Sequence, residues 1–226
     1  AVVAHCRALI DAVAPAVVAV KPQLACFERL GAPGWAALET VCSAAREHGL
    51  LVIADGKRGD IDVSAAAYAA GLFGGLTTPV GPVPGLGADA ATVAPYMGSD
   101  SVRPFVEAAR TGGAGIFVLL RTSNPGAAEL VEAELVAGGP FWERVAAMIA
   151  SFDDGLGRLS DVGAVVGATA PGALVRAREL LPRAIFLLPG VGAQGGSVED
   201  LAPAFAPGPG GGLVAVSRAI AQAGGA

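Results

Sequence analysis

Charged residues gather directly after an apolar run, in the segment VIADGKRGDID at residues 52–62. The chain as a whole is only 15% charged, so this group is unusual for the molecule. Alternate side chains of a β-strand point the same way, and Asp55 and Lys57 would therefore face one side together. Opposite charges held close to each other favour both ionised forms. The pattern predicts a charged site at a strand end, made of Lys21, Asp55, Lys57 and Asp60.

A charged cluster of this kind has a purely structural interpretation, an ion-pair network that stabilises a strand end. Several charges withdrawn from water are an expensive way to gain stability, because each loses hydration. A catalytic or binding role is therefore the favoured interpretation.

A glycine-rich segment and an arginine later in the chain predict a phosphate site. The segment LPGVGAQGG covers residues 188–196, and VSRAI covers residues 216–220. Glycines let backbone N–H groups approach an anion, and an arginine supplies a planar pair of charged donors. The candidate binding residues here are Pro189, Gly192, Gln194, Ser217 and Arg218.

A third segment, RTSNPG at residues 121–126, combines small hydroxyls with a Pro-Gly turn. Such a turn can present side-chain and backbone hydrogen bonds to a planar polar ligand, with Ser123 as the candidate. An ordinary surface loop explains the same residues equally well.

The elements that must position these residues alternate along the chain. Apolar, β-branched runs predict strands within residues 16–22, 50–57, 88–96, 114–123, 162–169, 184–192 and 212–220. Helical spacing lies between them, at residues 35–48, 101–111, 140–151, 171–181 and 197–205. This alternation predicts parallel strands joined by right-handed crossovers, in either an open doubly wound sheet or a closed barrel.

Two observations favour an α/β fold of the (β/α)₈ TIM-barrel type, in one domain over residues 1–226. Polar residues or glycines end nearly every strand, and a barrel gathers its chemistry at that one rim. No G-x-G-x-x-G segment follows the first strand, as a dinucleotide-binding open sheet would require. Because residues 1–14 have helical character, the count stops at seven strands. The first strand of the barrel is therefore expected to precede this chain.

Bulk properties exclude several classes of partner. The net charge is −5 with scattered basic residues, which does not suit a nucleic-acid surface. Residues 63–88 carry no charge, but their six glycines and three prolines suit a loop better than a membrane-spanning helix. Three cysteines without metal-ligand spacing predict small core residues in a reducing cytoplasm; these are Cys6, Cys26 and Cys42.

Taken together, the motifs resemble those of bacterial orotidine 5′-phosphate decarboxylases. The matching segments are VKPQ, ADGKRGDID, RTSNPG, LPGVGAQGG and VSRAI, in the family's order from about residue 16 to residue 220. The resemblance implies a homodimeric (β/α)₈ barrel that converts orotidine 5′-monophosphate to uridine 5′-monophosphate, the last step of de novo pyrimidine nucleotide synthesis. It also implies a reaction without metal or organic cofactor.

Site roles follow from the resemblance, residue by residue. Lys57 would protonate C6 of the pyrimidine, and Asp55 would sit against the substrate carboxylate beside Lys21. Ser123 would contact the pyrimidine amide, and Gln194 and Arg218 would hold the phosphate. Three residues would act from the partner subunit: Asp60, Ile61 and Ser64.

The chain departs from the family pattern at three positions near the charged motif. Gly56 stands where alanine is usual, Asp62 where glycine is usual and Ser64 where threonine is usual. An inward-pointing Asp62 would weaken the binding of an anionic substrate. The family's ribose-binding aspartate belongs to the strand expected before the chain.

Three other functions share parts of these motifs. One is a Mg²⁺-dependent sugar-phosphate decarboxylase of the same superfamily, which also has the D-x-K-x-x-D pattern. The second is a Schiff-base aldolase that uses Lys57, and the third is a catalytically silent nucleotide-binding barrel. Retention of all the charged positions argues against the third.

Overall fold

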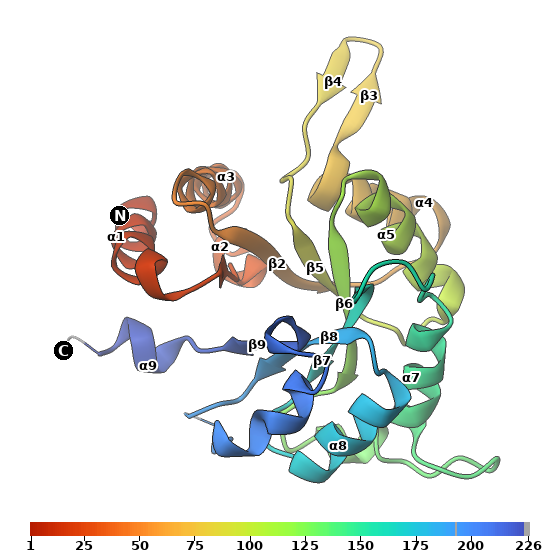
Figure 1. Cartoon of the computed structure of the whole chain (residues 1–226). Coiled ribbons are helices and arrows are strands. Elements are labelled where there is room, and N and C mark those ends of the chain that lie inside the picture. The colour runs from red at the N-terminus through yellow and green to blue at the C-terminus, as the bar shows by residue number, and fades with distance from the viewer. Residues whose placement is uncertain (193, 224–226) are drawn as a thin grey trace. The chain divides into compact units, whose positions relative to one another are not determined.

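The computed structural model describes residues 1–192 and 194–223. It divides the chain into two compact units, Ala1–Gly115 and Ile116–Ala226. Each unit contains parallel strands alternating with helices (Figure 1). The single-domain organisation over residues 1–226 stays a prediction.

The first unit is built on three parallel strands. These are β1 (Ala19–Val20), β2 (Leu51–Arg58) and β5 (Ala90–Val93), with β2 paired on one side with β1 and on the other with β5. Residues 52–54 of β2 and all of β5 are buried. A strand covered on both faces is continuously apolar, which accounts for the uninterrupted run before Asp55.

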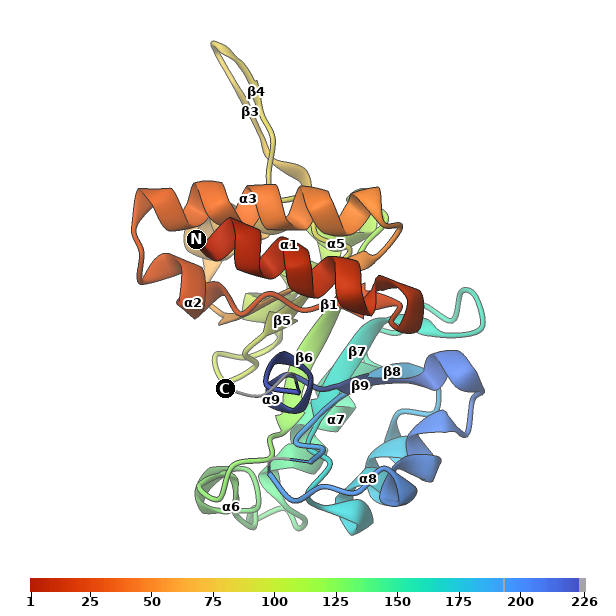
Figure 2. The same cartoon turned by 90° about the vertical axis from the view of Figure 1, so that its left-hand side faces the viewer.

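Helices α1 (Val2–Val13), α2 (Leu24–Glu28), α3 (Ala32–Glu47) and α5 (Ser99–Thr111) accompany these strands, with a short 3₁₀ turn, η1 (Ala14–Ala16), after α1. Helix α1 packs against α3, and the two lie side by side in Figure 2. Helix α3 begins with Pro33 in its first turn and is followed by Gly49 at φ +71°. These are the residue types expected at a helix start and just beyond a helix end. The predicted helix at residues 1–14 is confirmed by α1.

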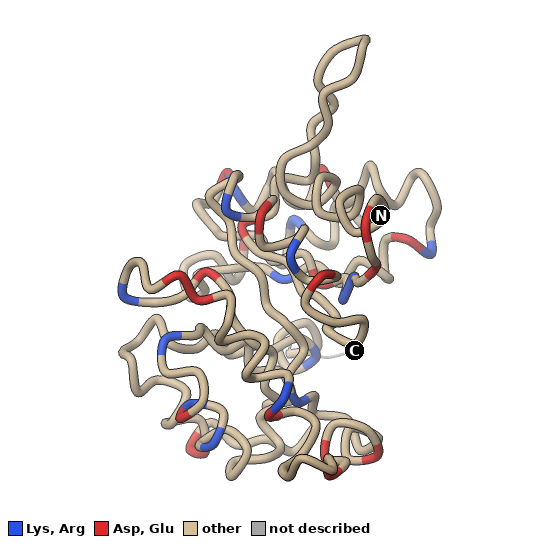
Figure 3. The backbone as a smooth tube through the Cα atoms, turned by 90° about the vertical axis from the view of Figure 1, so that its right-hand side faces the viewer, with Lys and Arg blue, Asp and Glu red and all other residues tan. Residues whose placement is uncertain are grey.

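The predicted loop at residues 63–88 is wrong in detail. The segment contains most of α4 (Asp62–Ala69), a π-helical turn η2 (Ala70–Gly74) and an antiparallel hairpin of β3 (Leu76–Thr78) and β4 (Gly81–Val83). In Figure 1 the hairpin extends as a slender arm, and in Figure 3 it carries no charged residue. Its strands of three residues are too short to show the alternation by which a strand is recognised. Among the described residues, no helix is both long enough and apolar enough to cross a bilayer.

The second unit is a parallel sheet in the order β6 (Gly115–Arg121), β7 (Ser160–Val166), β8 (Ala184–Pro189) and β9 (Gly212–Ala215). Strand β6 begins at the last residue of the first unit. The helices of this part are α6 (Ala127–Leu130), α7 (Phe141–Ala150), α8 (Pro171–Leu180) and α9 (Arg218–Ala221). Two 3₁₀ segments, η3 (Glu199–Phe205) and η4 (Pro209–Gly211), complete it. Each of the seven predicted strand segments therefore overlaps a strand of the structure. The helix predicted at residues 197–205 is a 3₁₀ segment, and the last strand ends at Ala215, before Ser217 and Arg218.

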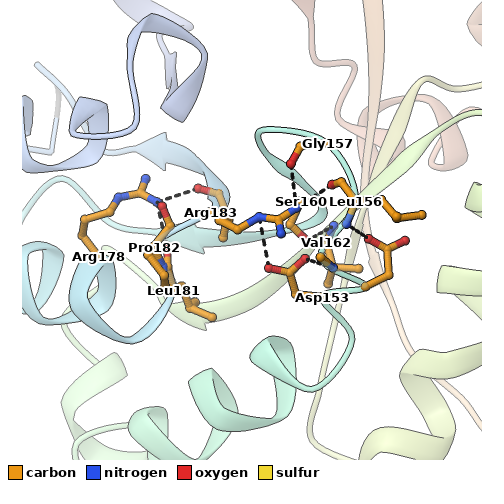
Figure 4. Close-up of polar contacts among 12 residues, drawn as sticks. Asp153, Leu156, Gly157, Ser160, Val162, Arg178, Leu181, Pro182 and Arg183 are labelled. Atoms are coloured by element: carbon orange, nitrogen blue, oxygen red, sulfur yellow. Dashed lines mark hydrogen bonds and ion pairs between the residues drawn. The ribbon is translucent and has the colours of Figure 1, made fainter.

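Two arginines organise the amino-terminal side of β7 and β8 (Figure 4). Arg183 pairs with Asp153, at 3.5 Å, and donates to the carbonyls of Leu156 and Gly157. Arg178 is 8% exposed, and its guanidinium lies 3.8 Å from the centre of the Phe186 ring. A small cavity beside Arg183 is lined mainly by apolar residues, with Asp153 and Ser160. In a barrel this end contributes stability, whereas the predicted site residues follow the opposite, carboxyl-terminal ends of the strands.

The prediction that all three cysteines are core residues is wrong for one of them. Cys42 is buried, Cys6 is half-buried and Cys26 is exposed. Burial raises the pKa of the Cys42 thiol to about 11, so that it stays protonated and behaves as a small apolar side chain. Cys26 lies on α2, where the preceding Leu24 and the following Phe27 fill the buried positions.

Candidate active site

Asp55 is the centre of the charged cluster in the first unit. Its side chain is 6% exposed and accepts from four donors. One carboxylate oxygen, Oδ2, accepts from Lys21 Nζ and from Gln23 Nε2, the latter at 3.2 Å. The other oxygen, Oδ1, accepts from Lys57 Nζ at 2.7 Å and from Thr92 Oγ1 at 3.0 Å. The predicted contact of Asp55 with Lys21 and Lys57 is therefore present in the structure.

Two opposing effects set the pKa of Asp55. Burial raises the pKa, because a carboxylate loses hydration inside the protein. The charge and hydrogen bond of Lys21, and then those of Lys57, lower the pKa by more, and the result lies below the ordinary value. Asp55 is thus an ionised carboxylate held between two ammonium groups.

The backbone delivers these groups through an irregularity at the end of β2. Ala54 pairs with Ala91 and Arg58 pairs with Val93, so the three residues between Ala54 and Arg58 lie opposite a single residue of β5. Lys57 has a φ of +48°, in the left-handed region that few non-glycine residues adopt. Bulges of this type recur beside active sites, where they redirect a side chain.

The prediction from the sequence did not include Gln23 and Thr92 among the site residues. Gln23 follows β1, within the motif VKPQ, and forms an isolated bridge with Asp55. Asp55 N also donates to Pro22 O at 3.1 Å, which ties the end of β1 to the end of β2. Their position in the sequence could have pointed to them, because both residues lie at or just beyond the ends of strands that already carry polar side chains.

Arg58 is the basic residue of the motif that faces away from Asp55. It pairs with Glu28 of α2, donates to Gly56 O at 3.0 Å and lies 5.5 Å from the centre of the Tyr68 ring on α4. The geometry gives Arg58 a structural task, because it links two helices to the bulge.

The predicted partner-subunit residues are not drawn into the cluster. Asp60 Oδ1 accepts from Ile61 N at 2.8 Å, and within the described residues it forms no ion pair with Lys21 or Lys57. Ile61 is 49% exposed, and Ser64, on α4, is also exposed. Ile61 and Ser64 are thus open to solvent, whereas Asp60 is half-buried.

Ser123 and Gln194 meet in the second unit, although they are far apart in the sequence. Ser123 Oγ donates to Gln194 Oε1 at 2.8 Å. Two glycines make room for Ser123: a Cβ on Gly167 would lie 2.7 Å from Ser123 Cα, and one on Gly190 would lie 3.0 Å from Ser123 Cβ. Gly190 also has a φ of +104°, so both space and backbone conformation require glycine. The structure therefore brings together the predicted pyrimidine contact and one predicted phosphate contact.

The glycine-rich loop after β8 folds back on itself. Gly196 N donates to Gly190 O at 3.0 Å, and Gly192 N donates to Gly196 O at 3.0 Å. Pro189 ends β8 opposite Ala215, the last residue of β9. Ala193 of the motif lies outside the described residues.

Ser217 and Arg218 follow the neighbouring strand β9 and are exposed, with Ser217 as the N-cap of α9. No hydrogen bond between Arg218 and Gln194 is present among the described residues. The parallel pairing of β8 and β9 places both loops at the carboxyl edge of the same sheet.

Local geometry accounts for two departures from the family motif. A Cβ on Gly56 would lie 2.7 Å from Leu24 Cδ1, so glycine at this position is matched to a leucine on α2. Asp62 has a φ of +44°, a conformation in which glycine is unstrained and aspartate is tolerated better than most residues. Asp62 is exposed and opens α4, where its charge suits the positive end of the helix dipole. No ion pair of Asp62 with Lys21 or Lys57 is present among the described residues.

Comparison with known sequences identifies the family. A sequence model described as "Orotidine 5'-phosphate decarboxylase / HUMPS family" matches residues 4–226. The chain belongs to this family. A relative named orotidine 5′-phosphate decarboxylase, from Deinococcus radiodurans, is 49% identical over 219 residues, covering 95% of this chain and 75% of the relative. Another of the same name, from Rhodopirellula baltica, is 45% identical over 221 residues, covering 95% of this chain and 71% of the relative.

Solved structures of the orotidine 5′-phosphate decarboxylase family have the same fold. A Streptomyces avermitilis structure described as a putative orotidine 5′-phosphate decarboxylase superposes with a TM-score of 0.83 at 38% identity, over 98% of this chain and 74% of that one. A Leishmania donovani OMP decarboxylase gives a TM-score of 0.79 at 36% identity, over 97% of this chain and 80% of that one. UMP synthase from the same organism is matched over 46% of its length. The predicted α/β fold class, a (β/α)₈ TIM barrel, is confirmed.

Proposed function

We propose that this chain decarboxylates orotidine 5′-monophosphate to uridine 5′-monophosphate. The observation that carries the proposal is the contact of Asp55 with both Lys21 and Lys57, in the motif by which the sequence resembles this family. The family description covers two names, and the relatives at 45–49% identity carry the name of the decarboxylase.

The cluster suits a reaction that passes through a carbanion. When the bond between C6 and the carboxylate breaks, its electron pair stays on C6 and carbon dioxide leaves. The pyrimidine ring does not delocalise that pair, so the uncatalysed reaction is very slow, and enzymes at the extreme of catalysis lower barriers by roughly 23 kcal/mol. An ammonium group already in place stabilises the developing charge without reorganisation. Lys57 then transfers its proton to C6.

Asp55 has two tasks in this mechanism. Its negative charge faces the substrate carboxylate, which favours loss of that group as neutral carbon dioxide. It also holds Lys21 and Lys57 in place through the ion pairs that its two carboxylate oxygens make. Lys21 and Gln23 hold Asp55 from its other oxygen.

Residues of the second unit would bind the parts of the nucleotide that do not react. We assign the pyrimidine amide to Ser123 and the phosphate to Gln194 and Arg218, with Pro189, Gly192 and Ser217 in the same two loops. The hydrogen bond between Ser123 and Gln194 supports a shared role. Binding energy from a remote phosphate lowers the barrier when it orients the reacting ring.

A homodimer is part of the proposal, with Asp60, Ile61 and Ser64 acting in the site of the partner subunit. The exposure of Ile61 and Ser64, and the separation of Asp60 from the lysines of its own chain, support it. No nucleic-acid or membrane partner and no metal or organic cofactor are proposed. Location in the cytoplasm stays a prediction.

The test is a spectrophotometric assay that follows loss of orotidine 5′-monophosphate absorbance, with and without EDTA. We expect turnover that EDTA leaves unchanged. Activity abolished by EDTA and restored by Mg²⁺ would instead support the sugar-phosphate decarboxylase. Covalent trapping of Lys57 by borohydride in the presence of substrate would support the aldolase. Binding of uridine 5′-monophosphate without turnover would leave only the silent nucleotide-binding barrel.

A further inference from the structure

Thr92 occupies the place on β5 that faces the whole bulge of β2. Because Ala54 pairs with Ala91 and Arg58 with Val93, Thr92 stands alone opposite Asp55, Gly56 and Lys57. It is also the polar residue of an otherwise apolar strand, AATV, and is 1% exposed.

The Thr92 hydroxyl makes two hydrogen bonds with the residues it faces. It accepts from the backbone N–H of Lys57 at 2.9 Å and donates to Asp55 Oδ1 at 3.0 Å. A hydroxyl carries one hydrogen, so accepting from Lys57 N directs that hydrogen to the carboxylate. The same Asp55 oxygen accepts from Lys57 Nζ at 2.7 Å. One side chain thus holds both the backbone and the carboxylate partner of the same lysine.

The left-handed backbone of Lys57 gives this arrangement its importance. A φ of +48° is unfavourable for lysine and persists only where neighbouring groups hold it. Thr92 is also the partner that the structure provides for the backbone N–H of Lys57. Loss of the hydroxyl therefore releases the backbone that aims the ammonium group.

We propose that Thr92 is a positioning residue for the decarboxylation, acting through Asp55 and Lys57 without touching the substrate. This inference rests on the proposed function. The alternative is that Thr92 is a core residue whose hydroxyl is merely satisfied, in which case a side chain of the same shape would serve equally well.

The test compares Thr92→Val, which keeps the shape and removes the hydroxyl, with Thr92→Ser, which keeps the hydroxyl. We expect Thr92→Val to lower kcat roughly ten- to hundredfold, the effect of one hydrogen bond to a charged group expressed in the transition state. Affinity for uridine 5′-monophosphate should change less than threefold, and Thr92→Ser should recover kcat to within a fewfold of the parent chain. The acid limb of the kcat profile in Thr92→Val should move to higher pH, because the charged form of Asp55 loses a hydrogen bond.

Thr40→Val is the matched control, since Thr40 lies on α3 and donates within its own helix to Ala36 O. It should leave kcat unchanged. An unchanged kcat in Thr92→Val, equal impairment of the serine and valine variants, or parallel loss of nucleotide affinity would overturn the inference.

A readout without turnover separates this inference from the proposed function. Amide hydrogen exchange at Lys57 should be faster in Thr92→Val and unchanged in Thr92→Ser, whatever reaction the chain catalyses. If the parent chain fails to decarboxylate the substrate, the proposed function is wrong. Amide hydrogen exchange at Lys57 then still decides whether Thr92 holds this backbone. Equal exchange rates in the parent chain and in Thr92→Val would refute the positioning role of Thr92.

Discussion

Lys57 Nζ lies 2.7 Å from Asp55 Oδ1, and the backbone between them leaves regular strand geometry to allow it. In an ideal strand the two side chains would stand parallel, two residues apart. The left-handed φ of Lys57 and the bulge opposite Thr92 instead set the ammonium group against the carboxylate. The contact is therefore a product of local backbone conformation as well as of charge.

Lys57→Ala should remove turnover while leaving nucleotide binding measurable. The variant loses both the charge that stabilises the carbanion and the proton that ends the reaction. Lys57→Arg is the informative companion, because arginine keeps the charge but does not release a proton under these conditions. It should bind uridine 5′-monophosphate and turn over far more slowly than the parent chain, as measured by stopped assay and calorimetry. Turnover near the parent rate in either variant contradicts the assigned role.

Asp55 should make the chain sensitive to acid. Its pKa is lower in the folded chain than in the unfolded chain, so folding releases protons as the pH falls toward the carboxyl range. Its stabilising contribution is complete above an ordinary pKa of about 3.9 and disappears as the pH falls through the folded value. Urea unfolding from pH 6 to pH 2.5 should therefore show a steeper loss of stability for the parent chain than for Asp55→Asn.

Asp11→Asn is the control for that experiment, because Asp11 is exposed and pairs with His48 at the surface. Its stability profile below pH 5 should follow that of the parent chain. Identical profiles for the parent chain and Asp55→Asn would show that Asp55 is not held ionised by the two lysines.

Gln194→Ala should weaken catalysis through binding. The change removes the acceptor for Ser123 Oγ and a proposed phosphate contact, and it should lower kcat/KM about tenfold, the equivalent of one hydrogen bond to a charged group. Thr122→Val removes a neighbouring hydroxyl that donates locally, to Asn124 Oδ1 at 2.6 Å, and is the matched control. Equal effects of the two changes on steady-state kinetics would argue against a specific role for Gln194.

The sequence was sufficient for the strand segments and for the core of the charged site. Buried parallel strands are continuously apolar, and Asp55 and Lys57 interrupt that pattern at its end. Thr92 and Gln23 were missed because their contacts depend on which residues a bulge places opposite each other. The register of a bulge is not encoded in residue periodicity. The hairpin at residues 76–83 was missed because each of its strands is only three residues long and the segment contains two prolines and a glycine.

The backbone conformation at position 62 explains why aspartate is tolerated where the family usually has glycine. Asp62 has a φ of +44°, and Asp62→Gly should leave the free energy of unfolding nearly unchanged. The glycine relieves backbone strain, which stabilises the folded chain. This gain is offset by the loss of the charge at the helix dipole and by the greater freedom of the unfolded chain. Asp62→Ala should cost about 1 kcal/mol of unfolding free energy relative to the glycine variant. Denaturant unfolding of the two variants measures this difference, and equal stabilities would mean that the left-handed conformation is not maintained.

Arg178 should matter more to stability than its neighbour Arg176, although within the described part of the chain only Arg176 has carboxylate partners. Arg176 pairs with Glu143 and Glu179 on an exposed surface, and such pairs contribute little.

Arg178 is buried and donates to five carbonyls of the second unit: Leu181 at 2.8 Å, Pro182 at 3.4 Å, Ala184 at 2.8 Å, Ala204 at 2.7 Å and Gly211 at 3.0 Å. Burial lowers the pKa of its guanidinium to about 10, which still leaves it charged at neutral pH.

Arg178→Leu should therefore lower the unfolding free energy by about 3 kcal/mol, because several buried acceptors lose a donor. Arg176→Leu should change it by less than about 1 kcal/mol. Denaturant unfolding followed by circular dichroism at neutral pH compares the two. A cost for Arg176→Leu equal to that of Arg178→Leu would show that the exposed ion pairs, and not the carbonyl contacts, stabilise this helix.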